Sequence, residues 1–146
     1  MAVRVAINGF GRIGRLVLRC IIETGRKDLQ VVAINDLGPA ESNAHLLRYD
    51  SVHGRFPGEV KVQGDRIIVD GQDLKVTAIK DPAQLPHKEL GVDIALECTG
   101  IFTSKDRASA HLSAGAKRVL IYESSFPEPL PHPCEFWRKR IGERMR

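Results

Sequence analysis

Hydrophobic positions follow two different spacings in the first part of the chain. Residues 3–8 form a short run rich in β-branched residues, which leads directly into a glycine-rich turn. Beyond the turn, apolar side chains recur at helical spacing, at Ile13, Leu16, Val17, Cys20 and Ile21. Gly25 ends this pattern, and residues 31–35 form a second strand-like run. The order strand, turn, helix, strand predicts one βαβ unit in about 30 residues.

The pattern changes further along the chain. Pro39 opens a short helix that continues through Leu47, and residues 59–79 alternate in short runs separated by turn signals, which predicts a small antiparallel meander. Residues 92–97 and 118–122 predict two more strands, joined by a helix with Thr103 as its N-cap and its end near Gly115. We therefore expect an α/β fold, with a Rossmann-type, doubly wound, mostly parallel sheet and a small antiparallel insertion.

The last part of the sequence differs in kind from the rest. Prolines alternate with other residues from 127 to 133, and residues 138–146 hold five basic side chains and one acidic one. Alternating prolines cannot form a central strand. We expect one domain over residues 1–121, followed by an atypical Pro-rich and basic tail over residues 122–146 that is disordered.

Composition narrows the class of protein. The chain has 146 residues, 42% hydrophobic and 27% charged, which is typical of a globular domain. No apolar run approaches the ~20 residues that span a bilayer, and the first residues lack a secretory signal. Three widely spaced cysteines exclude a disulfide framework and a Cys-x-x-Cys zinc site, and a net charge of +4 is too small to indicate nucleic acid. We expect a cytoplasmic protein that uses neither metal nor membrane.

The glycine-rich turn matches a phosphate-binding pattern. Residues 9–14 read Gly-Phe-Gly-Arg-Ile-Gly, between a predicted strand and a predicted helix, and Asp36 follows Gly14 by 22 positions. Gly9 permits the tight turn, Gly11 lets a pyrophosphate approach the backbone, and Gly14 allows close packing of helix on strand. The helix N-terminus favours the phosphates, and Asp36 favours NAD over NADP because a carboxylate repels a 2′-phosphate.

The sequence offers little support for a nucleophile or a metal ligand. Cys20 falls on the buried face of the first helix, Cys98 reads as a packed thiol at a strand end, and Cys134 lies in a stretch without a rigid scaffold. Surface or capping roles are expected for the histidines, and none has metal-ligand spacing: His45, His53, His87, His111 and His132. We predict no catalytic residue and no metal ligand.

Five segments together resemble the glyceraldehyde-3-phosphate dehydrogenase family. They are residues 6–15 (AINGFGRIGR), 33–37 (AINDL), 47–54 (LRYDSVHG), 97–102 (ECTGIF) and 114–121 (AGAKRVLI). The resemblance covers residues 1 to about 121 without a gap. It implies a Rossmann domain that binds NAD.

The resemblance also implies roles for individual residues. Arg12 and Ile13 would meet the pyrophosphate through backbone N–H groups, and Asp36 would bind the adenine ribose. Leu37 and Phe102 would flank the adenine, and Thr99 and Gly100 would line the cleft. Lys80 stands where the family usually has arginine. The full set expected to bind the cofactor is Asn8, Gly9, Phe10, Gly11, Arg12, Ile13, Gly14, Asn35, Asp36, Leu37, Lys80, Thr99, Gly100 and Phe102.

The family oxidises an aldehyde phosphate to an acyl phosphate with NAD, in glycolysis, and is homotetrameric. Its catalytic Ser-Cys-Thr-Thr-Asn turn does not occur in this sequence, and residues 122–146 resemble nothing in the family, which suggests a frameshifted or otherwise aberrant reading. We expect this chain to be inactive alone. Three alternatives stay open: a fragment of erythrose-4-phosphate dehydrogenase, which tends to carry Glu where this chain has Asp36; a nucleotide-binding module without catalysis; and, less favoured, a nucleic-acid binder that uses the basic tail.

Overall fold

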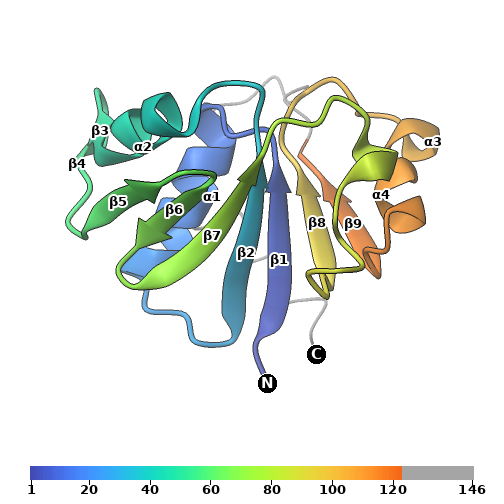
Figure 1. Cartoon of the computed structure of the whole chain (residues 1–146), viewed down its shortest axis with the longest axis horizontal. Helices are drawn as coiled ribbons and strands as arrows, with labels where there is room; N and C mark the ends of the chain where they lie inside the picture. The colour runs from blue at the N-terminus through green and yellow to red at the C-terminus, as the bar shows by residue number, and fades with distance from the viewer. Residues whose placement is uncertain (123–146) are drawn as a thin grey trace.

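A seven-stranded sheet forms the centre of the protein. The computed structural model describes residues 1–122 (Figure 1), so the expected tail lies outside the described residues apart from Tyr122. The strands run in the order β5-β6-β7-β2-β1-β8-β9. Five of them are parallel: β1 (Val3–Asn8), β2 (Leu29–Asn35), β7 (Gln72–Thr77), β8 (Ile94–Glu97) and β9 (Arg118–Ile121). The expected mostly parallel, doubly wound sheet is confirmed.

The antiparallel insertion extends one edge of this sheet. β5 (Val60–Gln63) pairs with β6 (Arg66–Val69), and β6 pairs with β7, in each case antiparallel. The meander is therefore as expected, but its last strand also joins the parallel sheet beside β2. A separate two-stranded hairpin, β3 (Tyr49–Asp50) and β4 (Gly54–Arg55), was not predicted because each strand is too short to show a period.

The helices agree with the hydrophobic pattern, with one correction. α1 (Arg12–Glu23) and α2 (Ala40–Arg48) lie where the spacing placed them, and η1 (Pro82–Gln84) is a short 3-10 turn. The single helix expected after Thr103 is instead two short ones, α3 (Lys105–Ala108) and α4 (Ala110–Ser113). Its N-cap is Ser104 rather than Thr103, because the Ser104 hydroxyl accepts from the Arg107 amide at 3.3 Å.

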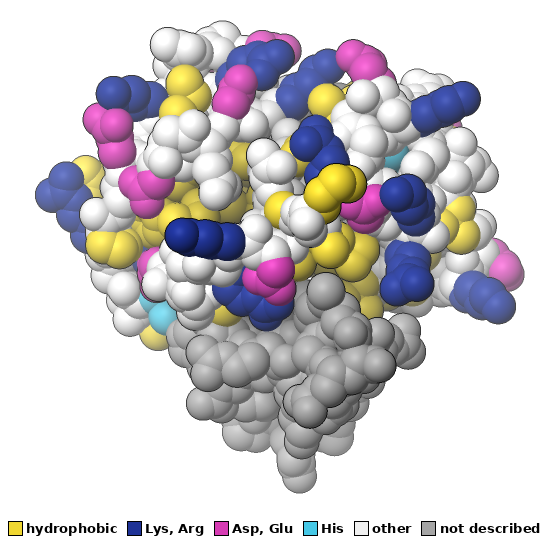
Figure 2. Space-filling model, turned by 90° about the horizontal axis from the view of Figure 1, so that it is seen from below, with side chains coloured by type: hydrophobic (Ala, Val, Ile, Leu, Met, Phe, Trp, Pro, Cys, Tyr) yellow, Lys and Arg dark blue, Asp and Glu magenta, His cyan; other side chains and the backbone are white. Residues whose placement is uncertain are grey.

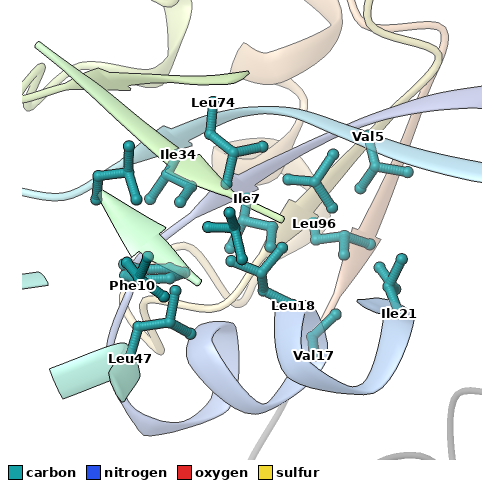
Figure 3. Close-up of a cluster of buried hydrophobic side chains, with 14 of the residues drawn as sticks. Val5, Ile7, Phe10, Val17, Leu18, Ile21, Ile34, Leu47, Leu74 and Leu96 are labelled. Atoms are coloured by element: carbon teal, nitrogen blue, oxygen red, sulfur yellow. The ribbon is translucent and has the colours of Figure 1, made fainter. Parts of the chain in front are cut away.

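The main hydrophobic core lies between α1 and one face of the sheet. Figure 3 shows α1 side chains, including Val17, Leu18 and Ile21, directed toward strand side chains such as Ile7 and Leu96. Because successive strand residues point to opposite faces, Val5 and Ile7 of β1 enter this core, whereas Ala6 faces the other side.

Smaller side chains cover the opposite face of the sheet. Ala6, Ala33 and Ala95 gather there with Val92 and Ala116. Apolar side chains therefore cover both faces, as parallel sheets require. This explains why residues 5–7 of β1 and 31–34 of β2 are continuous hydrophobic runs rather than alternating ones.

The order of the strands reverses at β1. The chain moves from β1 to β2 on one side, and β8 lies on the other side of β1 (Figure 1). In open α/β sheets, ligands bind outside the carboxyl ends of the strands at such a point. Asn35, Asn8 and Glu97 end β2, β1 and β8 there, and they are register partners across the three strands.

Figure 2 views the molecule from the end of the sheet at which the chain starts. Lys and Arg side chains lie among Asp and Glu side chains on the described part of this face, rather than in a patch of one sign. Among residues 1–122, no helix combines the length and apolar character that a membrane span needs. In the same residues, no three His, Cys, Asp or Glu side chains converge as they would around a metal ion.

Candidate functional site

A cleft of about 510 Å³ lies at the carboxyl ends of β1, β2 and β8. It gathers segments that are far apart in the sequence, as expected for a switch point. Nine of the fourteen residues expected to bind a cofactor line it: Asn8, Gly9, Gly11, Asn35, Asp36, Leu37, Lys80, Thr99 and Phe102. The topology alone therefore gathers most of the candidate residues around one cavity.

The turn between β1 and α1 is shaped by glycines. Gly9 has a φ of +90°, and a Cβ there would lie 2.7 Å from the backbone N of Thr99. A Cβ on Gly14 would lie 2.2 Å from the carbonyl O of Gly9. Both distances are far below normal contact, so only glycine fits. The tight turn at Gly9 and the close packing of α1 at Gly14 are confirmed as structural features.

The first turn of α1 is left open toward the cleft. Gly11 is the N-cap and provides no side-chain hydrogen bond, and the first turn holds no acidic residue. The first N–H groups of a helix have no partner within the helix, and they carry a partial positive charge. A Cβ built on Gly11 meets no atom within 4 Å, so space is open in front of this backbone. This arrangement suits an anion.

Asp36 joins two turns at the edge of the cleft. Its Oδ2 accepts from the Phe10 amide at 3.0 Å, and its Oδ1 accepts from the Gly38 amide at 2.9 Å. The carboxylate is only partly buried and lines the cleft. These two bonds fix the side chain before any ligand arrives, which reduces the entropy lost on binding.

Five expected residues do not line the cleft: Phe10, Arg12, Ile13, Gly14 and Gly100. Phe10 is 1% exposed, and its side chain belongs to the core, so it can meet a ligand only through its backbone. The Arg12 guanidinium lies 3.7 Å from the Asp50 carboxylate and is about half exposed. Arg12, Ile13 and Gly14 begin α1 beside the cleft, where a ligand could reach the amides rather than the side chains.

Apolar side chains form the rim of the cleft. Leu37 and Ile101 are 62% and 63% exposed, and Phe102 is half-buried between the solvent and the cleft. Exposed large apolar side chains that border a cavity indicate a surface for a flat, partly apolar ligand. Asp36 supplies a polar group close to Leu37, which is the combination that a nucleoside would need.

Three residues that line the cleft were not in the set expected to bind a cofactor, namely Ile79, Cys98 and Ile101. Ile79 follows β7, and only the unexpected parallel pairing of β7 with β2 brings it to this edge. Burial, and then the charge of Glu97, raise the pKa of the Cys98 thiol to about 12. The thiol therefore stays protonated at neutral pH and does not provide a nucleophile.

Two histidines correct the expectation of surface or capping roles. His87 and His111 are 3% and 0% exposed, and their rings meet with Nε2 of His87 3.0 Å from Nδ1 of His111. His111 Nε2 in turn lies 2.8 Å from Glu97 Oε2. Burial, together with the charge that His111 can carry, lowers the pKa of His87 to about 4. Helical spacing could not find this pair, because the partners come from separate segments of the chain.

Glu97 is a buried carboxylate beneath the cleft, 1% exposed. Burial acts to raise its pKa, but hydrogen bonds from His111, Thr99 and Asn8 outweigh burial and lower the pKa below its ordinary value. Glu97 is therefore ionised at neutral pH. Glu97 opens the segment 97–102 that resembles the family, but the sequence assigned it no role, since a single carboxylate at the end of a strand does not reveal its partners.

Comparison with known proteins identifies the same region of the chain. The family model described as "Glyceraldehyde 3-phosphate dehydrogenase, NAD binding domain" matches residues 3–105. A glyceraldehyde-3-phosphate dehydrogenase of Xanthobacter flavus is 76% identical over 121 residues, which is 83% of this chain and 36% of that protein. The enzyme of the same name from Thermotoga maritima is 57% identical over 118 residues, 81% of this chain and 35% of that protein.

The chain thus spans about a third of the length of these curated relatives. The family model extends from β1 to the start of α3 and so includes every strand end and loop that forms the cleft. NAD is the cofactor that the family model assigns to this domain. With its glycine turn, its switch-point cleft and this match, the chain belongs to the NAD-binding domain family of glyceraldehyde-3-phosphate dehydrogenase.

Proposed function

We propose that the cleft binds NAD, with the pyrophosphate at the first turn of α1 and the adenosine beside Asp36. The observation that carries this proposal is the uncapped N-terminus of α1, which opens on the cleft next to Gly11. A phosphate is favoured there by unpaired N–H groups and by the helix dipole. Asp36, fixed by two backbone amides, would accept hydrogen bonds from the ribose hydroxyls.

The remaining candidate residues fit this placement. Leu37 and Phe102, which both line the cleft, would flank the adenine. Gly9, Gly11, Arg12 and Ile13 would meet the pyrophosphate through their backbone, while Thr99, Gly100, Asn8 and Asn35 would shape the wall. Lys80 lines the cleft as well, but an ammonium cannot stack on adenine as a planar guanidinium would.

We further propose that the protein to which this domain belongs oxidises an aldehyde phosphate with NAD, as the names of the relatives indicate. The cofactor accepts the hydride in such a reaction, and the domain described here holds and orients it. The family turn Ser-Cys-Thr-Thr-Asn does not occur among the 146 residues. A homotetramer and a cytoplasmic location are proposed on the same resemblance.

The first test measures binding and turnover on one purified sample of the 146-residue chain. We expect NADH to bind in a fluorescence titration, whereas reduction of NAD with glyceraldehyde-3-phosphate and phosphate stays undetectable. Loss of positioning alone can raise a barrier by ~7–11 kcal/mol. A folded sample that fails to bind millimolar NADH would contradict the binding proposal, and turnover at ~1 per second or faster would contradict the expected inactivity.

A second prediction concerns the choice between NAD and NADP. Replacing Asp36 with alanine should narrow the preference for NADH over NADPH by about tenfold or more, because the charge that repels a 2′-phosphate is gone. Both affinities should fall together as well, since the amides of Phe10 and Gly38 lose their acceptor. The ratio of the two dissociation constants is therefore the quantity to measure.

Asp65, which is exposed in the turn between β5 and β6, offers a matched control. The Asp65→Ala chain should keep the original ratio. If the unaltered chain binds NADH and NADPH equally well, Asp36 does not select the cofactor.

A further inference from the structure

A row of polar side chains crosses the sheet beneath the cleft. The strand register places Thr77, Asn35, Asn8 and Glu97 side by side on β7, β2, β1 and β8. Their side chains are joined in the same order: Thr77 Oγ1 donates to Asn35 Oδ1 at 2.8 Å, Asn35 Nδ2 to Asn8 Oδ1 at 2.7 Å, and Asn8 Nδ2 to Glu97 Oε2 at 2.6 Å. His111 and His87 continue the row away from the sheet.

Within this row, Glu97 only accepts hydrogen bonds. Four donors surround its carboxylate: Asn8 Nδ2, His111 Nε2, and the amide and hydroxyl of Thr99. An ionised carboxylate offers about four lone-pair sites, so every site is used. Because Glu97 and His111 are closed to solvent, water has no access to replace a donor that is lost.

Glu97 connects directly to the wall of the cleft. Asn8 and Thr99, two of its hydrogen-bond partners, both line the cavity. The backbone of residues 98–99 also presses on Gly9, where a Cβ would come within 2.9 Å of the Cys98 carbonyl carbon. A shift of the Glu97 side chain would therefore move the wall at Thr99 and the glycine turn beside it.

His111 holds the far side of the carboxylate. It comes from α4, which covers this part of the sheet, and its ring is held in turn by His87 near η1. His87 Nδ1 has no partner among the described residues. Burying a carboxylate and two imidazoles is expensive compared with an apolar trio of the same volume, so the arrangement is not explained by stability alone.

We propose that His111 is a positioning residue for the dinucleotide cleft, which acts through Glu97 to fix Asn8 and Thr99 in the cleft wall. The effect on the ligand rests on the proposed binding of NAD. The effect on the cleft wall does not depend on NAD, since it concerns hydrogen bonds within the chain. The effect on the wall and the effect on ligand binding can therefore be measured separately.

The test compares two replacements of His111. Glutamine keeps an amide donor at about the reach of the imidazole Nε2, whereas leucine keeps the volume without a donor. We expect His111→Leu to weaken NADH binding about tenfold, the change that 1.4 kcal/mol produces, and His111→Gln to stay within about threefold of the unaltered chain. His45→Leu, at an exposed position on α2, is the control and should bind NADH as the original does.

A second measurement follows the cleft wall at Thr99 in the absence of a ligand. In amide NMR spectra, the Thr99 resonance should shift and its hydrogen exchange should quicken in the leucine variant but remain near the original in the glutamine variant. If the leucine variant does not fold, His111→Asn replaces it. The asparagine amide is one methylene too short to reach Glu97, so the asparagine variant should behave as the leucine variant does.

The outcomes are distinct. Equal losses of NADH affinity in the glutamine variant and in the leucine variant (or the asparagine variant that replaces it), or an unchanged Thr99 amide in both, would overturn the positioning role. If the unaltered chain does not bind NADH but Thr99 responds as expected, the wall assignment holds and the binding proposal fails.

Discussion

Replacing Gly14 with alanine should both destabilise the domain and abolish dinucleotide binding. The new Cβ would lie 2.2 Å from the Gly9 carbonyl oxygen and 3.1 Å from Ile7 Cγ2. The Gly9 backbone cannot retreat, because its amide is bonded to the Asn35 carbonyl at 2.8 Å and its other side presses on Thr99. Overpacking costs ~1–3 kcal/mol and sometimes more, and so close a backbone contact belongs at the upper end. Alanine regains ~1 kcal/mol as a helix former, which leaves a net loss of about 2 kcal/mol or more.

Gly11→Ala is the matched comparison at the same turn. Gly11 has a φ of −70°, which any residue adopts, and a Cβ there meets nothing within 4 Å. The free energy of unfolding should therefore change by no more than about 0.5 kcal/mol. The affinity for NADH should nevertheless fall about tenfold or more, because the methyl group occupies the space through which a phosphate would reach the backbone.

Urea unfolding and NADH titration of both variants check this pair of expectations. The two variants should differ in what they lose. Gly14→Ala should lose both stability and NADH binding, whereas Gly11→Ala should lose NADH binding alone. A Gly11→Ala chain that binds NADH as tightly as the original would show that the pyrophosphate does not approach this backbone. A Gly14→Ala chain of unchanged stability would show that α1 can move away from β1.

The second large effect is a loss of stability in mild acid, centred on His87. Burial lowers the pKa of His87 from its ordinary 6.5 to about 4, so the unfolded chain binds this proton more readily than the folded one. The contribution of neutral, buried His87 to the free energy of unfolding is fully present above pH 6.5 and is lost as the pH falls toward 4. This difference between the folded and unfolded pKa values corresponds to about 3 kcal/mol. Glu97, whose pKa is lowered, adds a further loss at the acid end, below its ordinary value of 4.5.

Urea unfolding at several pH values between 8 and 4.5 measures this slope. The His87→Gln chain can still donate to His111 but cannot take up a proton, so its stability should fall much less between pH 6.5 and 4.5. His45→Gln, at an exposed position, should leave the slope as it is. An unaltered chain whose unfolding free energy is the same at pH 7 and pH 5 would contradict the assignment of this loss to His87.

Local pattern was sufficient for the parallel core and for the glycine turn. Strand and helix periods placed β1, α1 and β2, and the spacing from Gly14 to Asp36 predicted a carboxylate at the end of β2. The break between α3 and α4 was not predicted, because the residue type at Ser109 is compatible with both a helix and a break. The hairpin at Tyr49–Asp50 and Gly54–Arg55 was also missed, since two-residue strands carry no period.

The buried polar row beneath the cleft is the clearest case of what required the tertiary structure. Asn8, Asn35, Glu97 and His111 belong to four elements. The resemblance placed Asn8 and Asn35 near the cofactor, but nothing in the sequence indicated that these four side chains bond to one another. Hydrogen bonding depends on distances of about 3 Å between groups far apart in sequence, which only strand register and the packing of α4 can set. By contrast, the spacing of Gly9, Gly11 and Gly14 lies within six residues and is visible in the sequence, although the close contact of Gly9 with Thr99 comes from the fold. The sequence by itself therefore determined the fold class and the glycine turn between β1 and α1, and the tertiary structure decided which distant side chains support that turn.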